Sequence, residues 1–429
     1  MHIVYTSLFL FIFCADAFAG PKGEKREGRY FTGIPAIAFN PDSGLIYGAV
    51  GFHFNNGDGA DERFEKSPYI HKHTILAVQS TKGMRQIKYL TDYPRIWNTI
   101  YRVKTDLIFY NNISSGYYGS DVSSMKSLSY PEALAAQIGE TRPKNYETYE
   151  ENLKKDRDGI TYARYNHFIE KNIETRLLIE RPILNENVFV AMGYEYSEND
   201  VTDYSNKKVD AVTGSSETTA IMQSTKLMLD HTASGLVGYN GGQVSGVILG
   251  LSYDTRDYEP NPSSGEYCQL ERKVFNKAIG SRFNYEKSLI GCSKYVSISE
   301  KHLFAMRAKH EWSSADTPFF QLPSLGGRKS LKGYRLARFR GLSASNLNVE
   351  SRHLVGRANF KNQIFESMPV LFLDFGRVYD KSFAYESGLW RKGYGIGHRL
   401  IWNQATVIGG EYAVFGEEKS IYLDINHIF

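Results

Sequence analysis

The sequence has no series of long apolar runs and little net charge. These two absences argue against a helical membrane protein and against a nucleic-acid-binding protein. Only residues 1–19 of the 429 contain a long apolar run, and the mean hydropathy is −0.39. A bundle of membrane-crossing helices needs several apolar stretches of about 20 residues, so that class is excluded. The formal net charge of +4 is small for this length and leaves no electrostatic footprint for nucleic acid. We therefore expect no nucleic-acid partner.

Cysteine is scarce. Of the three cysteines, Cys14 lies in the apolar N-terminal stretch, while Cys268 and Cys292 are placed symmetrically about Gly280 in a turn-like run. If that run is the tip of a hairpin, the two residues lie directly opposite each other, where Cβ atoms are roughly 4.5–5.5 Å apart. A disulfide between Cys268 and Cys292 is then possible. Two free thiols that face different sides are the alternative.

Enzyme signatures are missing as well. The sequence contains no GxSxG, P-loop, HExxH or CxxC motif. Its 11 histidines are scattered and suggest no pair of ligands on a shared face. We accordingly expect no catalytic residues, no cofactor and no metal, and we do not interpret the chain as an enzyme.

The N-terminus has the features of an export signal. The stretch from Ile3 to Cys14 is apolar, and Ala17-Phe18-Ala19 has the small-x-small pattern of a cleavage site. We expect residues 1–19 to be a cleaved signal peptide and residues 20–429 to be the exported chain.

Aromatic residues and glycine are abundant instead, with 14% aromatic residues and 38 glycines. This composition fits either a large soluble all-β protein or a transmembrane β-barrel, whose alternating strands hide their hydrophobicity from any average. The C-terminus favours the barrel. Ile421, Leu423 and Ile425 alternate with polar residues, and the chain ends on Phe429. A lipid-facing apolar row opposite a wetter row, with a terminal aromatic residue, is typical of outer-membrane barrels.

Segments of this kind recur along the chain at the length of about ten residues that a tilted membrane strand needs. We count sixteen, an even number that puts both chain ends on one side of the membrane. The segments are 31–40, 45–54, 72–79, 85–90, 97–110, 160–183, 187–196, 246–256, 265–275, 283–299, 301–312, 346–356, 370–379, 393–401, 408–414 and 421–429. We predict an all-β fold: a 16-stranded antiparallel transmembrane barrel in the bacterial outer membrane.

Three connections are long, at roughly 111–158, 198–243 and 313–345. If the C-terminus is periplasmic, these connections are extracellular. In the first, residues 130–155 have partial helical character. In the second, Ser216–His231 is predicted to form a short amphipathic helix. The simplest interpretation of both is a solvated surface loop.

The third connection is unusually basic. Residues 325–341 include six cations among glycines that permit a tight turn. A cationic loop inside a pore needs a carboxylate for a partner, and Asp374 is placed to supply one. On its strand Leu371 and Leu373 would face lipid, whereas Asp374 and Gly376 would face the lumen, and Gly376 would leave space for the loop. Glu350 and Glu411 are further candidates for lumen carboxylates. An exposed loop that binds surface polyanions is the alternative. The cations are Arg328, Lys329, Lys332, Arg335, Arg338 and Arg340.

These residues resemble the motifs of the bacterial surface antigen superfamily, which includes the barrel subunits of the Bam and Tam assembly machines. Its characteristic sixth loop carries an aliphatic-Arg-Gly-aromatic tetrad, matched here by Leu331, Lys332, Gly333 and Tyr334. Its Phe-x-Asp-x-Gly strand motif is matched by Phe372, Asp374 and Gly376. Residues 254–265 are similar to a periplasmic turn of the family, and residues 33–44 to its first hairpin. The resemblance covers nearly all of residues 30–429 and implies that the basic loop folds into the lumen, with Lys332 paired to Asp374.

Two departures from the family pattern matter. Lys332 replaces the arginine of the tetrad, and lysine cannot form a planar bidentate fork, so a weaker hold on Asp374 is expected. Family members that assemble or secrete proteins usually carry periplasmic POTRA domains. Between Gly20 and Tyr30 there is room for none, so we expect a barrel without POTRA domains.

Three classes of function remain. The resemblance to insertases implies assembly or remodelling of the outer membrane through a weak seam between the first and last strands. Pro35 removes a backbone donor from the first strand and Gly33 softens it, while Ile425 and Phe429 lie on the last strand. The alternatives are a passive pore or transporter gated by the basic loop, and a structural protein that contacts lipopolysaccharide. The expected partners are outer-membrane lipids, lipopolysaccharide and a separate periplasmic or POTRA-bearing protein.

Overall fold

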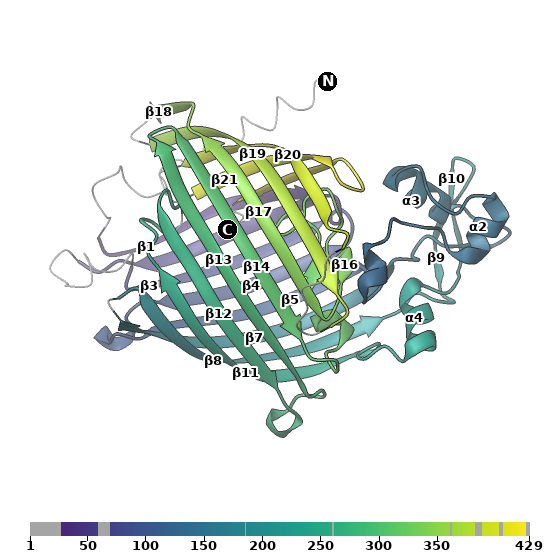
Figure 1. Ribbon diagram of the computed structural model, residues 1–429, viewed down its shortest axis with the longest axis horizontal. Coiled ribbons are helices and arrows are strands. Elements are labelled where there is room, and N and C mark those ends of the chain that lie inside the picture. Colours follow the sequence, from purple (N-terminus) through teal and green to yellow (C-terminus); the bar gives the residue numbers. More distant parts are fainter. Residues whose placement is uncertain are drawn as a thin grey trace.

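The computed structural model describes residues 27–58, 69–184, 186–259, 261–360, 363–381, 388–402 and 406–425. Their main sheet closes on itself into a barrel of strongly tilted antiparallel strands (Figure 1). The barrel has sixteen strand positions, which confirms the predicted fold. One position is divided between β17 and β18, which both pair with β19. In barrel order the strands are β1 (Arg29–Asn40), β2 (Gly44–Asn55), β3 (His71–Ser80), β4 (Met84–Tyr93), β5 (Arg102–Gly116), β7 (His167–Leu184), β8 (Val188–Thr202), β11 (Gly241–Asp254), β12 (Gly265–Phe275), β13 (Tyr285–Ser299), β14 (His302–Ser313), β17 (Ser343–His353) with β18 (Gly356–Phe360), β19 (Gln363–Tyr379), β20 (Arg391–Trp402), β21 (Thr406–Phe415) and β22 (Ser420–Ile425).

The barrel has its apolar side chains outside and many of its charges inside. On β19, Leu371 and Leu373 are 61% and 38% exposed, whereas the alternating residues Phe372 and Asp374 are buried. The same alternation exposes Ile75, Ile290 and other apolar residues on strands around the wall. An outward apolar band opposite a polar interior is the arrangement that a lipid environment stabilises. Among the helices of the described residues, none has the length and apolarity needed to cross a membrane.

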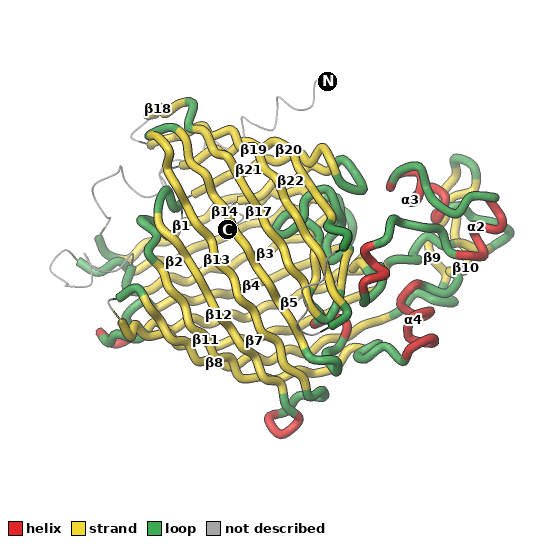
Figure 2. The backbone as a smooth tube through the Cα atoms, in the orientation of Figure 1, coloured by secondary structure: helices red, strands yellow, loops and turns green. Residues whose placement is uncertain are grey.

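The three long connections join β5 to β7, β8 to β11 and β14 to β17, so they lie at the same rim. The first two form a lobe beside that rim (Figure 1). Figure 2 shows that this lobe holds most of the helical structure, apart from short turns at the barrel ends. The opposite rim contains the first described residues of β1 and the last of β22.

The lobe contains both helices and a small sheet. The partial helical character predicted for 130–155 corresponds to α2 (Glu132–Ile138) and α3 (Tyr146–Lys154). Tyrosines dominate its core, with Tyr130, Tyr146, Tyr149 and Tyr162 packed around Leu134 and Leu153.

The helix predicted for Ser216–His231 is wrong over its first half. Ser216–Met222 is strand β10, which pairs with β9 (Lys208–Thr213) across a turn at Gly214 and also with β6 (Ile160–Thr161) of the first connection. Its threonines suit a strand better than a helix. The helix is α4 (Lys226–Ser234), and it starts where the Thr225 side chain accepts a hydrogen bond from the Met228 N–H.

Two predicted strand starts also differ from the structure. Trp97 does not begin β5, because it lies in a short 3-10 turn with a positive φ of 49° and is exposed. Ile160 does not begin β7, since it belongs to β6 in the lobe and β7 starts at His167. In both cases a segment outside the barrel carries apolar residues that look like a strand extension.

The first and last strands meet at a short seam. β1 has 12 residues and pairs with β2 along its whole length. β22 has 6 residues, and its pairing with β1 in the described part of the chain is recorded at Phe39 and Leu423. Over the described residues, the seam is therefore less extensively paired than the neighbouring β1–β2 contact.

Candidate functional site

Part of the third connection forms a compact loop that contacts β17, β19 and β20. β15 (Ser324–Leu325) and β16 (Phe339–Arg340) pair at its base, so residues 326–338 form its tip. Leu331, Lys332 and Tyr334 of the tip are 0%, 0% and 3% exposed. The tip is thus packed against the barrel wall, and the four residues singled out in the sequence lie at its centre.

Lys332 and Asp374 contact each other at the inner wall. Lys332 Nζ lies 3.1 Å from Asp374 Oδ2, and the Lys332 backbone N–H donates to the same oxygen at 3.1 Å. The Asn348 side chain donates to Asp374 Oδ1 at 2.7 Å and to the carbonyl of Ser330 at 2.8 Å. The Lys332 ammonium also lies 4.2 Å from the centre of the Phe372 ring. Three groups therefore hold the carboxylate in place, and the ammonium gains a cation–π contact as well.

Small residues of the wall make room for the tip. A Cβ added at Gly376 would lie 2.9 Å from Leu325 and 3.5 Å from Leu331, and one at Gly393 would lie 2.2 Å from the carbonyl of Lys332. Tyr334, the aromatic residue of the tetrad, contacts β20 instead of the space at Gly376. The Tyr334 hydroxyl donates to the carbonyl of Lys392 at 3.1 Å. The side chains that fill the space at Gly376 are thus leucines.

Glu350 and Glu411 lie in a chain of buried ion pairs. Glu350 accepts from Arg352 Nε at 2.9 Å and from Arg399 Nη2 at 2.7 Å. Arg399 also lies 3.5 Å from Glu411, which accepts from Arg328 of the loop tip at 3.0 Å. The sequence analysis missed Arg352 and Arg399. The available signal was strand alternation, because Arg352 follows Glu350 by two residues and therefore shares its face.

The loop also contacts the hairpins on both sides of the seam. Arg335 donates to the carbonyl of Pro41, in the turn between β1 and β2, and its Nε lies 2.9 Å from Glu418, in the turn between β21 and β22. Next to it, the Leu336 N–H donates to Asp42 at 3.0 Å. Arg338 forms a bidentate pair with Glu417 at 2.6 and 2.7 Å. One loop thus joins the first and last hairpins.

Burial shapes the electrostatics of this junction. It raises the pKa of the Glu418 carboxyl to about 7, although Arg335 opposes that shift. It also raises the pKa of Asp42, again against Arg335. Both groups are carboxyls whose ionised forms are disfavoured by lost hydration, and we therefore expect the contacts at this junction to depend on pH.

The residues expected at the seam are described in part. Gly33 and Pro35 lie on β1, opposite Gly51 and Ala49 of β2. The backbone of Ile425 ends β22 and pairs with Ile408. Phe429 lies outside the described residues, as does the predicted signal peptide.

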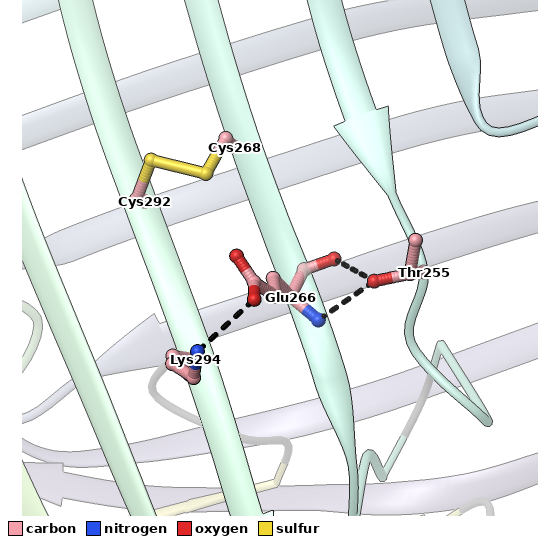
Figure 3. Close-up of a disulfide and its surroundings, with 5 residues drawn as sticks. All are labelled: Thr255, Glu266, Cys268, Cys292 and Lys294. Atoms are coloured by element: carbon pink, nitrogen blue, oxygen red, sulfur yellow. Dashed lines mark hydrogen bonds and ion pairs between the residues drawn. A yellow bond between two sulfur atoms is a disulfide. The ribbon is translucent and has the colours of Figure 1, made fainter.

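Cys268 and Cys292 are directly opposite each other on β12 and β13, and their sulfur atoms are bonded. Figure 3 shows the disulfide between the two strands. It also shows the ion pair of Glu266 and Lys294, which are each two residues from the cysteines on the side of the turn that precedes β12. The Cα atoms of the two cysteines are 4.1 Å apart.

Three histidines gather elsewhere on the wall, and here the sequence interpretation is wrong. His53, His71 and His73 share one face, and their ligand atoms all lie within 4.8 Å of one another. His53 and His71 are 18 residues apart in the sequence, so their proximity is not visible there. The pairing of β2 with β3 brings them together.

Comparison with known proteins gives the family. The profile of the Omp85 superfamily domain matches residues 101–414, which is most of the chain. The chain belongs to the Omp85 superfamily. This result confirms the resemblance drawn from the loop and strand motifs, and it identifies the protein as an outer-membrane β-barrel of that superfamily. A second profile, described as "Domain of unknown function (DUF5982)", matches residues 23–70 of this Omp85 barrel.

Solved structures agree with the fold of this Omp85 barrel. BamA from Haemophilus ducreyi lacking POTRA domains 1–3 aligns with a TM-score of 0.53 at 12% identity, over 94% of this chain and 71% of that one. CdiB from Escherichia coli aligns with a TM-score of 0.53 at 9% identity, over 92% of this chain and 62% of that one. The Omp85 barrel therefore spans less than two thirds of the CdiB chain. None of the curated proteins matches its sequence.

Proposed function

We propose that this Omp85 barrel acts in outer-membrane assembly or remodelling by opening sideways between β1 and β22. The observation that supports the proposal is the unequal pairing of β1 within the described residues, where all 12 of its residues pair with β2 but Phe39 alone pairs with β22. Each backbone hydrogen bond contributes about 0.5–1.5 kcal/mol net, so a shorter ladder opens more readily. Pro35 removes one further donor from the first strand.

The loop supplies the second element of the proposal. Because Arg335 contacts both the β1–β2 turn and Glu418, it holds the two hairpins that would separate. Lys332 and Asp374 anchor the same loop to β19, several strands from the seam. We propose that this anchoring, the loop lock, keeps the lumen closed while the opposite side of the loop controls the seam.

The test is to close the seam covalently. Phe39 and Leu423 are paired across it, so Phe39→Cys with Leu423→Cys, in a Cys268→Ser/Cys292→Ser background, can form a disulfide there. We would reconstitute the barrel in liposomes and follow the folding of a urea-denatured eight-stranded barrel by its heat-modifiable mobility. We expect the oxidised variant to lose the acceleration that the native barrel gives and to regain it on reduction.

A matched pair controls for the cross-link itself. Leu251 and Leu270 face each other on β11 and β12 and are similarly exposed on the outer wall. Leu251→Cys with Leu270→Cys should leave the activity unchanged after oxidation. If the native barrel does not accelerate folding, or if the closed seam is as active as the open one, the assembly proposal is wrong.

A gated pore is the second candidate, because the loop tip contacts two buried carboxylates of the barrel strands, through Lys332 with Asp374 and Arg328 with Glu411. Lys332→Ala would then increase ion conductance in planar bilayers, whereas the seam disulfide would not change it. A purely structural role in contact with lipopolysaccharide has less support, since five of the six loop cations have partners within the protein; Lys329 is the exposed one.

We further propose that outer-membrane lipids surround the barrel and that a separate periplasmic or POTRA-bearing protein delivers its substrates. Co-purification of such a partner after cross-linking in intact cells would support delivery. Recovery of the barrel alone, with full folding activity, would contradict it.

A further inference from the structure

We propose that the barrel binds one divalent transition-metal ion, with Zn²⁺ as the expected ion, through His53, His71 and His73 on its outer surface. The site is distinct from the basic loop and does not depend on the proposed role in assembly. It lies at the rim opposite the long connections, where β3 begins.

The strand pairing brings the three side chains together. His71 and His73 are two residues apart on β3, so they point to the same side of the sheet. His53 of β2 is paired directly with His73. That side is the outer one, because Ile75, the next residue of this row on β3, is 55% exposed. The cluster is therefore a triangle across two hydrogen-bonded strands.

The triangle has dimensions close to those of a three-histidine metal site. The ring centres of the three pairs are 5.1, 5.5 and 5.6 Å apart, and one nitrogen from each ring lies within 4.8 Å of the others. Zn²⁺ takes histidine nitrogens at about 2.0–2.1 Å, which places tetrahedral ligands about 3.3 Å from one another. Small side-chain rotations close that difference, because all three rings are only half-buried.

Two tyrosines hold the imidazole ring of His73 in place. The Tyr89 hydroxyl lies 2.7 Å from His73 Nδ1, and the Tyr93 hydroxyl lies 3.1 Å from His73 Nε2. An ion takes one of these nitrogens and leaves the other as an N–H donor to its tyrosine. A hydrogen bond of this kind fixes the tautomer and the orientation of a metal-bound imidazole. Phe31 of β1 stacks on His53 at 4.4 Å and supports the second ligand.

The ligand set determines the class of ion. Three neutral imidazoles suit Zn²⁺, Cu²⁺ and Ni²⁺, whereas Mg²⁺ and Ca²⁺ prefer carboxylate and carbonyl oxygens. With three protein ligands, water completes the coordination. The bound ion would join β2 to β3, next to the strand that forms the seam.

The same rim provides a control. His302 and His353 lie side by side on β14 and β17, with ring centres 3.9 Å apart. Among the residues that the structure describes, no third histidine, cysteine or carboxylate completes this pair. The pair therefore tests whether any two surface imidazoles suffice.

The experiment uses the complete barrel, purified in detergent and stripped with chelator. Zn²⁺ binding is measured by competition with a chromophoric indicator, and correct folding of each variant by heat-modifiable mobility. We expect one Zn²⁺ per barrel, at least tenfold weaker binding in His53→Gln and in His73→Gln, and no change in His302→Gln/His353→Gln. Equal affinity in the native and triple His53→Gln/His71→Gln/His73→Gln proteins would overturn the proposal.

A second measurement does not require variants. Cu²⁺ bound to the native barrel should give an electron paramagnetic resonance spectrum with three equivalent nitrogen ligands. A spectrum dominated by oxygen ligands, or one with a single nitrogen, would contradict the site even if a histidine variant failed to fold.

Discussion

Lys332 Nζ lies 3.1 Å from Asp374 Oδ2, and both side chains are completely buried. An ion pair in open water contributes only about 0–1 kcal/mol, but removing one partner of a buried pair leaves a charge without compensation. The burial of both residues favours the second case. This contact connects a loop that begins after β14 to the inner face of β19.

The first prediction concerns this pair. Lys332→Ala and Asp374→Ala should each lower the free energy of unfolding by roughly 3–5 kcal/mol, because each leaves a buried charge unpaired. The double variant should be no worse than either single one. Lys332→Arg should preserve the contact, since it restores the fork of the family motif. Urea unfolding in detergent measures all four variants, and additive effects of the two alanine changes would show that the residues do not interact.

The second prediction concerns Arg338, which is 2% exposed. It donates to Glu417 and to the carbonyls of Ser124 and Lys126, so it joins three connections. Arg338→Ala should destabilise the barrel by about 3–5 kcal/mol. Lys329→Ala, an exposed cation of the same loop, should change stability by less than about 0.5 kcal/mol. Similar losses in both variants would indicate a general loss of loop charge instead.

The third prediction is a pH dependence at the junction of the hairpins. The pKa of Glu418 is raised to about 7 in the folded protein, whereas an unfolded glutamate titrates near 4.3. Between these values the folded state binds the additional proton, so the contribution of Glu418 to stability falls as the pH rises from about 4.5 to 7. Glu418→Gln should flatten this part of the stability curve, as measured by urea midpoints at successive pH values. An unchanged slope would show that Glu418 does not titrate in this range.

The fourth prediction concerns the disulfide. Cys268 and Cys292 enclose a separation of 24 residues, for which a cross-link contributes roughly 2–4 kcal/mol. Cys268→Ser/Cys292→Ser should lower stability within that range, and the unreduced native protein should show no alkylatable thiol at either position after denaturation. Modification of both thiols without reductant would mean that the bond is not formed in the mature protein.

The fifth prediction concerns orientation. Glu147 and Ser216 are exposed in the lobe, and Lys301 is exposed in a turn at the other rim. If the lobe is extracellular, a membrane-impermeant thiol reagent should label Glu147→Cys and Ser216→Cys on intact cells. Lys301→Cys should react only after the outer membrane is permeabilised. The reverse pattern would invert the topology.

The sequence by itself determined the barrel. Alternation with a period of two is a local property, and the row Leu371, Leu373 opposite Asp374 could be assigned before any pairing was known. The errors of the sequence-based prediction also arose from local patterns. Trp97 and Ile160 extend apolar patterns beyond the true starts of β5 and β7, since alternation does not reveal where a strand leaves the sheet.

Only the tertiary structure decided which distant residues meet. The register of β2 with β3 places His53 opposite His73, and the closure of the barrel brings Pro41 and Glu418 to the same arginine. A shift of one residue in the β2–β3 pairing would turn His53 and His73 to opposite faces. Register and closure depend on contacts along the whole wall. No short segment of sequence contains that information, so the histidine cluster and the loop contacts at the seam emerged only from the folded barrel.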